Sequence, residues 1–402
     1  MRTHLFVALL CCFSGVIVPV CAPCQVGTFP KLDALASSYV GRTNTKGLSV
    51  GVLYNGSVHF AGYGQLSARE SSVPDEATLY EIGALSGVFV TALLAVQESK
   101  GILAPTTLIK EVIPEGHAIP GFTPTRLVEI SQDSSAGNAP SSKTIVCMPD
   151  PVAGTTEVTL CQLAYHSSGL QFPGKPVVDW HPLAGPAALR LAGQDLPDLT
   201  ALLGRAGGST FRFPPGAQFE FSTMGIALLG NLLAAHARVP YEALLKNSLT
   251  GPLGMADTRL LPTPAQLDRL APGHDTRGRQ APNWHFQAMA PAMGLKSNTR
   301  DLVQLLRALS ERMPPFDENT VQRIQQGVLP VHFPGWQRPT SSAFGWFAST
   351  LEDNRMVVWM SGATEGYRAF AAFDPQRKTG IVLLANSAED LTELGFAMLR
   401  TL

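Results

Sequence analysis

The segment from Tyr80 to Val96, YEIGALSGVFVTALLAV, constrains the fold of this chain more than any other stretch. Its apolar residues recur at three- and four-residue spacing, at Leu85, Phe89, Ala92, Leu93 and Val96. This spacing gathers them on one face of an α-helix, so the segment predicts a buried helix. The chain can supply the surrounding core, because 45% of its 402 residues are apolar and only 15% are charged.

Charge and motif content exclude several classes of function. The formal net charge is −1 and no basic run occurs, which excludes nucleic acid and an anionic membrane surface as expected partners. The nine histidines are scattered, and the sequence contains no H-E-x-x-H, no paired C-x-x-C and no phosphate-binding glycine loop. We therefore expect neither a metal nor a cofactor.

The first 22 residues have the pattern of a signal peptide. Arg2 and His4 precede an apolar run from Leu5 to Val20, and Val20-Cys21-Ala22 is a small-residue cleavage site. A single membrane anchor is the alternative, but the run is short for a span and no stop-transfer charges follow. Lipid attachment at Cys21 or Cys24 is a further alternative. The pattern favours export to a secreted or periplasmic location, with no membrane span after signal removal.

Four of the six cysteines lie at or before Cys24. The other two, Cys147 and Cys161, are close enough in sequence to close a small loop in an oxidising compartment. The alternative is two separate buried thiols. Export favours a Cys147–Cys161 disulfide.

Strand patterns occur near both ends of the chain, with helical patterns between them. Residues 48–54 and 57–63 alternate around Asn55-Gly56, a strong hairpin signal, and alternating segments return from residue 344. We expect one domain over about residues 30–400, with a sheet from 30–66 plus 285–402 and a helical region at 67–284. Residues 114–157 are rich in Pro, Gly and Ser, and predict a flexible surface insertion.

The segment E-I-G-A-L-S-G at residues 81–87 resembles the nucleophile helix of the serine β-lactamase and penicillin-binding-protein family, in particular the class C β-lactamase and DD-peptidase branch. That family has Ser and Lys three residues apart, so that the amine lies beside the hydroxyl whose proton it takes. Ala84 stands at the Ser position and Gly87 at the Lys position. A glycine inside a helix costs about 1 kcal/mol relative to alanine, so Gly87 predicts close packing where the Lys side chain would run.

Two further motifs of the family are also altered. In P-P-G-A-Q-F-E-F-S-T, Phe221 stands at the position of the family's Tyr and Thr223 at that of its Asn. By its spacing to the following G-Y-x-x-F-x-x-F-D-P, the K-T-G motif corresponds to Ser361-Gly362-Ala363. A literal K-T-G at residues 378–380 lies in the turn before a later strand, and we interpret it as chance.

The resemblance extends over about residues 30–400. It implies an α/β fold of the β-lactamase/penicillin-binding-protein (transpeptidase-like) type, with an antiparallel sheet flanked by helices and an inserted helical region. Because three motifs have lost their reactive groups, we expect an exported pseudoenzyme that binds a ligand, such as a cell-wall peptide or acyl compound, or a partner. The alternatives are a serine hydrolase with rearranged catalytic groups and a structural protein with a filled cleft.

Overall fold

The computed structural model describes residues 29–42, 46–67, 72–132, 142–149, 154–173, 198–333 and 335–402. The predicted signal peptide at residues 1–22 lies outside this part of the chain. Among the described residues, no helix combines the length and the apolar character needed to cross a membrane.

The helices and strands follow one another in a single series. They are α1 Pro30–Val40, β1 Gly47–Tyr54, β2 Ser57–Gly64, β3 Tyr80–Glu81, η1 Gly83–Ser86, α2 Gly87–Ser99, α3 Ile109–Val112, β4 Thr125–Gln132, β5 Ser142–Pro149, α4 Leu160–Ala164, β6 Leu170–Gln171, α5 Leu199–Gly207, β7 Thr210–Phe211, α6 Thr223–Ala237, α7 Tyr241–Leu245, η3 Lys246–Thr250, α8 Pro264–Leu267, η4 Gln287–Met289, α9 Ala290–Met293, β8 Lys296–Ser297, α10 Thr299–Glu311, α11 Glu318–Gln325, β9 Leu329–Pro330, β10 Thr340–Ser342, β11 Phe347–Thr350, β12 Met356–Ala363, β13 Arg368–Asp374, β14 Thr379–Ala385 and α12 Thr392–Leu399.

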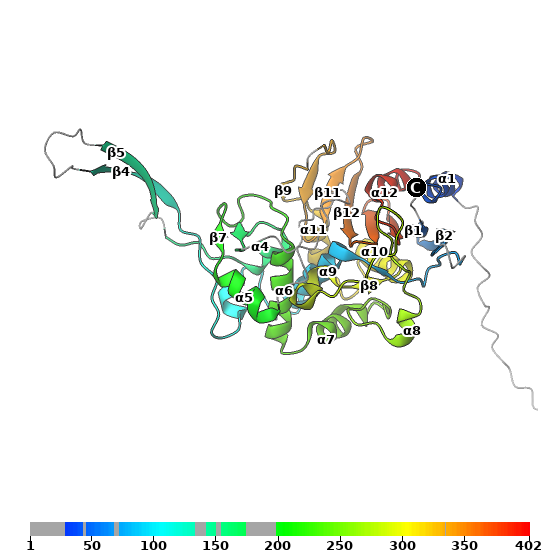
Figure 1. The fold of residues 1–402 in the computed structure, drawn as a ribbon, viewed down its shortest axis with the longest axis horizontal. Coiled ribbons are helices and arrows are strands. Elements are labelled where there is room, and N and C mark those ends of the chain that lie inside the picture. Colours follow the sequence, from blue (N-terminus) through cyan, green and yellow to red (C-terminus); the bar gives the residue numbers. More distant parts are fainter. Residues whose placement is uncertain are drawn as a thin grey trace, which may run out of the picture.

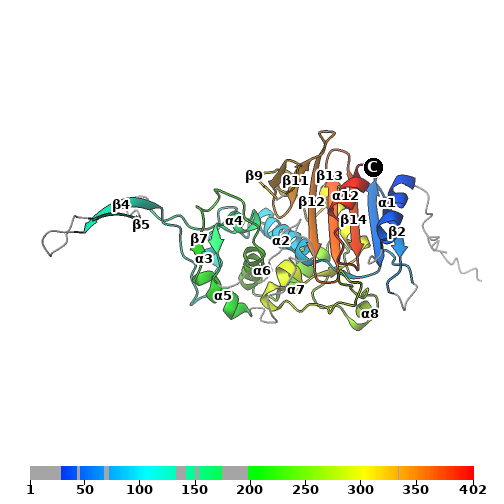
Figure 2. The same ribbon diagram turned by 45° about the horizontal axis from the view of Figure 1, so that its top comes forward.

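One antiparallel sheet combines the two ends of the described chain. Its strand order is β2-β1-β14-β13-β12-β11-β10-β9, so the N-terminal hairpin pairs with the last strand. The hairpin turns at Asn55 and Gly56, whose φ angles of 51° and 75° are those of a type I′ turn, the turn predicted from Asn-Gly. Helix α10 packs on β1, β13 and β14, while α12 packs on β13 and β14 and also contacts α1 (Figures 1 and 2). An antiparallel sheet flanked by helices is the fold class predicted from the sequence.

The two faces of the sheet are covered by different helices. A Cβ at Gly380 in β14 would lie 3.2 Å from Leu306 of α10, and Phe370 of β13 lies against Gly395 of α12. Gly380 pairs with Phe373, whose side chain points away from that of Phe370 three positions earlier, because neighbouring strand residues alternate. The sheet is therefore the middle layer, and its buried strands form the main core.

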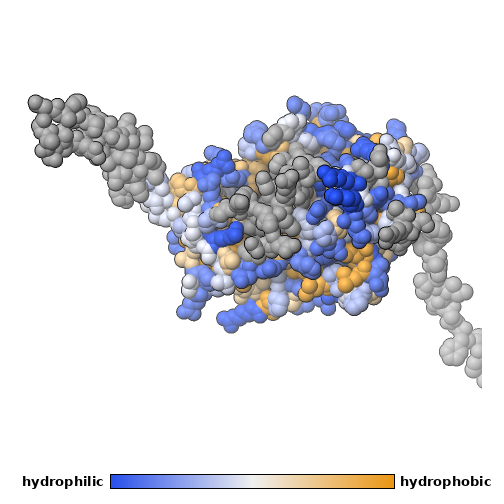
Figure 3. All heavy atoms as spheres, viewed as in Figure 1, coloured by the Kyte–Doolittle hydropathy of each residue, from blue (hydrophilic) through white to orange (hydrophobic). Residues whose placement is uncertain are grey.

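The helical region lies beside this layered unit and is centred on α2 (Figure 2). Every residue of α2 from Gly87 to Gln97 is buried, and the helix packs against α6, α9, α11 and the turn η3. A helix that is apolar all round belongs in a core. On the face drawn in Figure 3, by contrast, hydrophilic and hydrophobic residues of the body are interspersed.

One expectation about local structure was wrong. The α-helix expected from Tyr80 starts later: Tyr80 and Glu81 pair with Ser297 and Lys296 as β3 and β8, residues 83–86 form the 3₁₀ turn η1, and α2 begins only at Gly87. The predicted insertion at 114–157 contains a two-stranded hairpin, β4–β5, which extends from the body as an arm in Figure 1. The Gly- and Ser-rich composition of residues 133–141 obscured the two strands on either side.

Candidate functional site

The chain turns sharply where the resemblance places the nucleophile. Gly83 has φ +51°, in the left-handed region that favours glycine, and a Cβ there would lie 2.4 Å from the carbonyl oxygen of Ala363. Ile82 donates its N–H to the Leu295 carbonyl at 3.1 Å, which fixes the preceding residue. The turn η1 then carries Ala84 into the start of α2, directly against the end of β12.

Four of the predicted site residues meet around one small cavity. Its described lining consists of Ala84, Gly87, His166, Phe221, Thr223, Ile226, Ala292, Gly345 and Met360. The cavity volume is ≈ 10 Å³, which is about the space of one water molecule. Small-molecule sites occupy roughly 300–1,000 Å³, so this cavity does not have the size of a substrate site.

Packing beside Gly87 accounts for part of this small volume. Ile226 of α6 reaches toward the first turn of α2, and its Cγ2 would lie 3.4 Å from a Cβ placed on Gly87. This distance is ordinary van der Waals contact, so a Cβ would fit at this position. The very close approach expected at Gly87 is therefore not found, because among the described residues Ile226 Cγ2 is the only neighbouring atom within 4 Å of the added Cβ.

The rings of Phe221 and His166 line one side of the cavity. Their rings stack with centroids 4.4 Å apart and an interplanar angle of 27°. The Ser222 backbone N–H donates to His166 Nδ1 at 3.0 Å, which leaves the imidazole proton on Nε2. Burial lowers the pKa of His166 to about 3, so the ring is neutral at pH 7. His166 therefore adds no charge to the cavity.

The structure does not bring Ser361 and Ala363 into the cavity; the strand residue that lines it is Met360. Gly362 lies on the same face of β12 as Met360, because side chains alternate along a strand. A Cβ at Gly362 would be 1.9 Å from the Ile82 carbonyl oxygen, so only glycine fits there. Of the three residues assigned to this motif from the sequence, Ser361 and Ala363 thus lie outside the lining of the cavity, and Gly362 is the one that meets the turn.

Other lining residues were missed by sequence reasoning. Ile226 lies one helical turn after Thr223, whereas Ala292 and Gly345 come from segments outside the recognised motifs, and such apolar or small residues give no chemical signal. Met360 could have been found from the alternation of β12, once Gly362 is recognised as the residue that must approach the turn.

The predicted Cys147–Cys161 disulfide is not formed in this structure. Cys161 is a free thiol, and the side chain of Cys147 lies outside the described part of the chain. The Cys161 thiol donates to Glu98 Oε1 at 3.4 Å and accepts from Arg323 at 3.1 Å, while Arg323 also pairs with Glu98. Burial raises the pKa of Cys161 to about 12, and the neighbouring Glu98 carboxylate acts in the same direction. This thiol is thus a hydrogen-bonded member of a polar cluster.

Across the described ranges, no group of three or more His, Cys, Asp and Glu side chains is placed to hold a metal ion. The nearest buried carboxyl group in sequence to the turn is Glu81, which accepts the Trp284 backbone N–H at 2.9 Å. Burial raises its pKa, and Lys296 on the paired strand opposes that shift. Glu81 does not line the cavity at Ala84.

Comparisons with known proteins agree with this architecture. A β-lactamase of Lysobacter lactamgenus is 21% identical over 90% of this chain and 88% of its own length. The D-alanyl-D-alanine-carboxypeptidase/endopeptidase AmpH of Escherichia coli K12 is also 21% identical, over 94% of this chain and 90% of that protein. The crystal structure of a β-lactamase/D-alanine carboxypeptidase from Pseudomonas syringae has the same fold, with a TM-score of 0.70 at 17% identity over 92% of this chain and 98% of that one. The family model described as Beta-lactamase matches residues 32–397. The chain therefore belongs to the β-lactamase family, the serine hydrolases that include the β-lactamases and DD-peptidases.

Proposed function

We propose that this chain is an exported, non-catalytic member of its family that acts by non-covalent binding instead of acyl transfer. The observation that carries the proposal is the cavity at Ala84 and Gly87, which has a volume of ≈ 10 Å³ and no charged side chain among its described lining residues. Acyl transfer needs a nucleophile, a group that takes its proton, and room for the acyl group. Among the described lining residues the only hydroxyl is that of Thr223, the only imidazole is the neutral His166 whose Nδ1 already accepts the Ser222 N–H, and the volume leaves no room for an acyl group.

We assign the altered catalytic positions from the geometry together with the resemblance. Ala84 replaces the nucleophile, Gly87 its base, and Phe221 and Thr223 the Tyr and Asn of the second motif. For the third motif we replace the assignment made from sequence spacing with Met360-Ser361-Gly362. The close approach of Gly362 to Ile82 supports this register, because it retains the motif's final glycine where only a glycine fits. Met360 then stands at the position of the cation.

The small volume of the cavity helps to decide between two expected functions, binding of a ligand in the cleft and a protein whose cleft is filled by its own side chains. A cell-wall peptide or acyl compound, the ligand expected from the family, needs a much larger volume than ≈ 10 Å³. The volume favours a filled cleft, with binding on another surface of the molecule. Export follows from the signal-peptide pattern of residues 1–22.

The test is intact-protein mass after incubation with a labelled penicillin, run beside an active class C β-lactamase as positive control. We expect no adduct on the unmodified chain. In another serine hydrolase, loss of the nucleophile alone costs on the order of 10⁶ in rate, so turnover of β-lactam, D-Ala-D-Ala and ester substrates should be close to background. Stoichiometric acylation would refute the proposal and favour a hydrolase with rearranged groups.

A repair series adds a second measurement. Ala84→Ser alone should give no adduct, because no neighbouring amine takes the hydroxyl proton. Ala84→Ser with Gly87→Lys should give slow acylation at most, since Phe221 and Met360 still lack the family's hydroxyl and cation. Rapid acylation of the single variant would show that another group of this chain acts as the base.

A further inference from the structure

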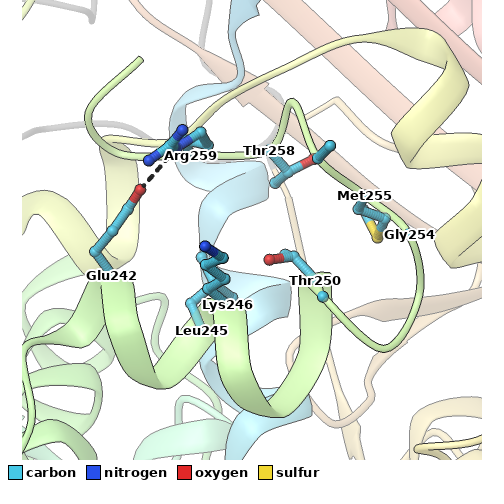
Figure 4. A pocket seen from close by; sticks show the side chains of 10 residues that line it. Glu242, Leu245, Lys246, Thr250, Gly254, Met255, Thr258 and Arg259 are labelled. Carbon is cyan, nitrogen blue, oxygen red and sulfur yellow. Dashed lines mark hydrogen bonds and ion pairs between the residues drawn. The ribbon is translucent and has the colours of Figure 1, made fainter. Parts of the chain in front are cut away.

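A second cavity, which shares no lining residue with the cavity at Ala84, lies between α7–η3 and the loop that follows. Its volume is ≈ 320 Å³, within the range of small-molecule sites. Figure 4 shows the helix on one side and the returning loop on the other, with side chains directed into the space between them. The lining residues are Glu242, Leu245, Lys246, Thr250, Gly251, Gly254, Met255, Ala256, Thr258 and Arg259.

The wall of this cavity is an irregular helical turn. Residues Lys246–Thr250 form a π-helix, closed by a hydrogen bond of 2.8 Å from the Gly251 N–H to the Lys246 carbonyl. A Cβ at Gly251 would lie 2.5 Å from that carbonyl oxygen, so the turn requires glycine. Turns of this type are rare and frequently occur at functional sites. Here the turn widens the helix next to the cavity.

The charged groups of the cavity leave one cation in excess. Glu242 is already engaged, since its Oε1 pairs with Arg259 Nε at 3.3 Å and its Oε2 accepts the Leu260 N–H at 2.8 Å. Lys246 is exposed, and its ammonium makes no hydrogen bond or ion pair with the described residues. In Figure 4 the Lys246 amine points toward the space below Arg259, and the Thr250 hydroxyl points into the same space. This arrangement favours an anion on that side.

The remaining surface of the cavity is apolar. Leu245 and Met255 are 1% and 2% exposed, so they belong to the core and form a fixed floor. Another cavity of ≈ 320 Å³, lined at Leu267, 270–273 and 280–283, has no charged lining residue. The combination of an unpaired cation with an apolar floor distinguishes the cavity at Lys246.

We propose that the cavity at Lys246 binds a small amphipathic carboxylate, with the carboxylate on Lys246 and the Thr250 hydroxyl and the hydrocarbon along Leu245 and Met255. This site is separate from Ala84 and Gly87, and its occupancy does not depend on whether the chain acylates. The hydrocarbon supplies affinity in proportion to the apolar area it buries, and the cation selects the charged head group.

The experiment is calorimetric titration of the full chain with octanoate, octanol and octylamine, which share a hydrocarbon but differ in head group. We expect saturable one-to-one binding of octanoate, binding of octanol about tenfold weaker, and none of octylamine. Shortening the acid to hexanoate should weaken binding by roughly fourfold per CH₂ removed, the equivalent of ~0.8 kcal/mol. Non-saturable uptake, or equal affinity for octanoate and octanol, would overturn the proposal.

Three variants locate the site. Lys246→Gln should weaken octanoate about tenfold and leave octanol unchanged, because it removes only the cation. Lys100→Gln, a matched exposed lysine at the end of α2, should change neither. Ala256→Phe, at an exposed lining position, should abolish binding of both ligands by filling the cavity. Unchanged octanoate affinity in both Lys246→Gln and Ala256→Phe would place the ligand elsewhere and refute the assignment.

Discussion

A lysine introduced at Gly87 should destabilise the fold strongly, because the family's own base no longer has a place there. Gly87 is buried, has ordinary helical dihedrals (φ −60°, ψ −29°), and lies beside a cavity of ≈ 10 Å³. Gly87→Ala should stabilise the fold by ~0.5–1 kcal/mol, since a Cβ fits at 3.4 Å from Ile226 and alanine is the better helix former.

Two longer side chains separate the effects of volume and charge. Gly87→Met adds about the volume of lysine without its charge, and overpacking of this kind costs ~1–3 kcal/mol. Gly87→Lys adds a buried ammonium with no carboxylate among the described lining residues, which costs about 3 kcal/mol beyond the Met variant. Urea unfolding followed by circular dichroism measures each difference.

The pH dependence of the Lys variant provides an independent check. The unfolded lysine titrates near pH ~10.4, and burial holds the pKa of the folded lysine below that value. Between the two pKa values the unfolded chain binds more protons, so the free energy of unfolding rises with pH. The gap between the Lys and Met variants should thus be constant at low pH and narrow toward pH 10. Equal stability of the two variants at pH 7 would refute the conclusion that this cavity is small and uncharged.

Three further predictions follow from other residues. Burial lowers the pKa of His166 to about 3, so between pH 6.5 and about 3 only the unfolded chain gains this proton, and the free energy of unfolding should fall as the pH falls through that window. The variant His166→Asn, whose side chain tolerates the left-handed backbone at φ +54°, should flatten this part of a plot of urea midpoint against pH. An unchanged slope would contradict the prediction. Burial raises the pKa of Cys161 to about 12, so iodoacetamide at pH 8 should leave this thiol unmodified in the native protein and label it in urea; peptide mass spectra showing native labelling would contradict this. Gly362→Ala should lower the free energy of unfolding by about 3 kcal/mol in thermal unfolding, because its Cβ would lie 1.9 Å from a backbone oxygen. The control Gly204→Ala, with open space around it, should be neutral or stabilising. Equal effects of the two substitutions would disprove the close contact at Gly362.

The elements fixed by local signals could be predicted from the sequence. Asn55-Gly56 gave the N-terminal hairpin because few residue pairs tolerate two positive φ angles. Asn298, a residue type preferred at helix N-termini, caps α10 by accepting the Asp301 N–H at 2.9 Å. Such features depend on neighbours in sequence, so one chain is enough to recognise them.

The start of α2 could not be predicted, because it depends on distant residues. Tyr80 and Glu81 have a helical hydrophobic pattern but pair with Ser297 and Lys296 instead, and Gly83 then reverses the chain. Whether Met360 or Ser361 stands at the first position of the third motif likewise depends on the contact between Gly362 of β12 and Ile82 before the turn. The small volume of the cavity reflects Ile226 and Ala292, which carry no motif. Long-range packing decided each of these features.

The pairing of β1 with β14 has a consequence for how the chain reaches its native state. The Gly47 N–H donates to the side chain of Asn386 at 2.8 Å, a contact that spans 339 residues. At a synthesis rate of about 5–20 residues per second, the N-terminal hairpin is complete tens of seconds before its neighbouring strand leaves the ribosome. During that interval the inner edge of β1 has unpaired N–H and C=O groups and cannot close the sheet. A chain whose first strands pair with its last strand cannot complete its sheet until synthesis is nearly finished, so the edge of β1 stays open to wrong partners throughout that interval.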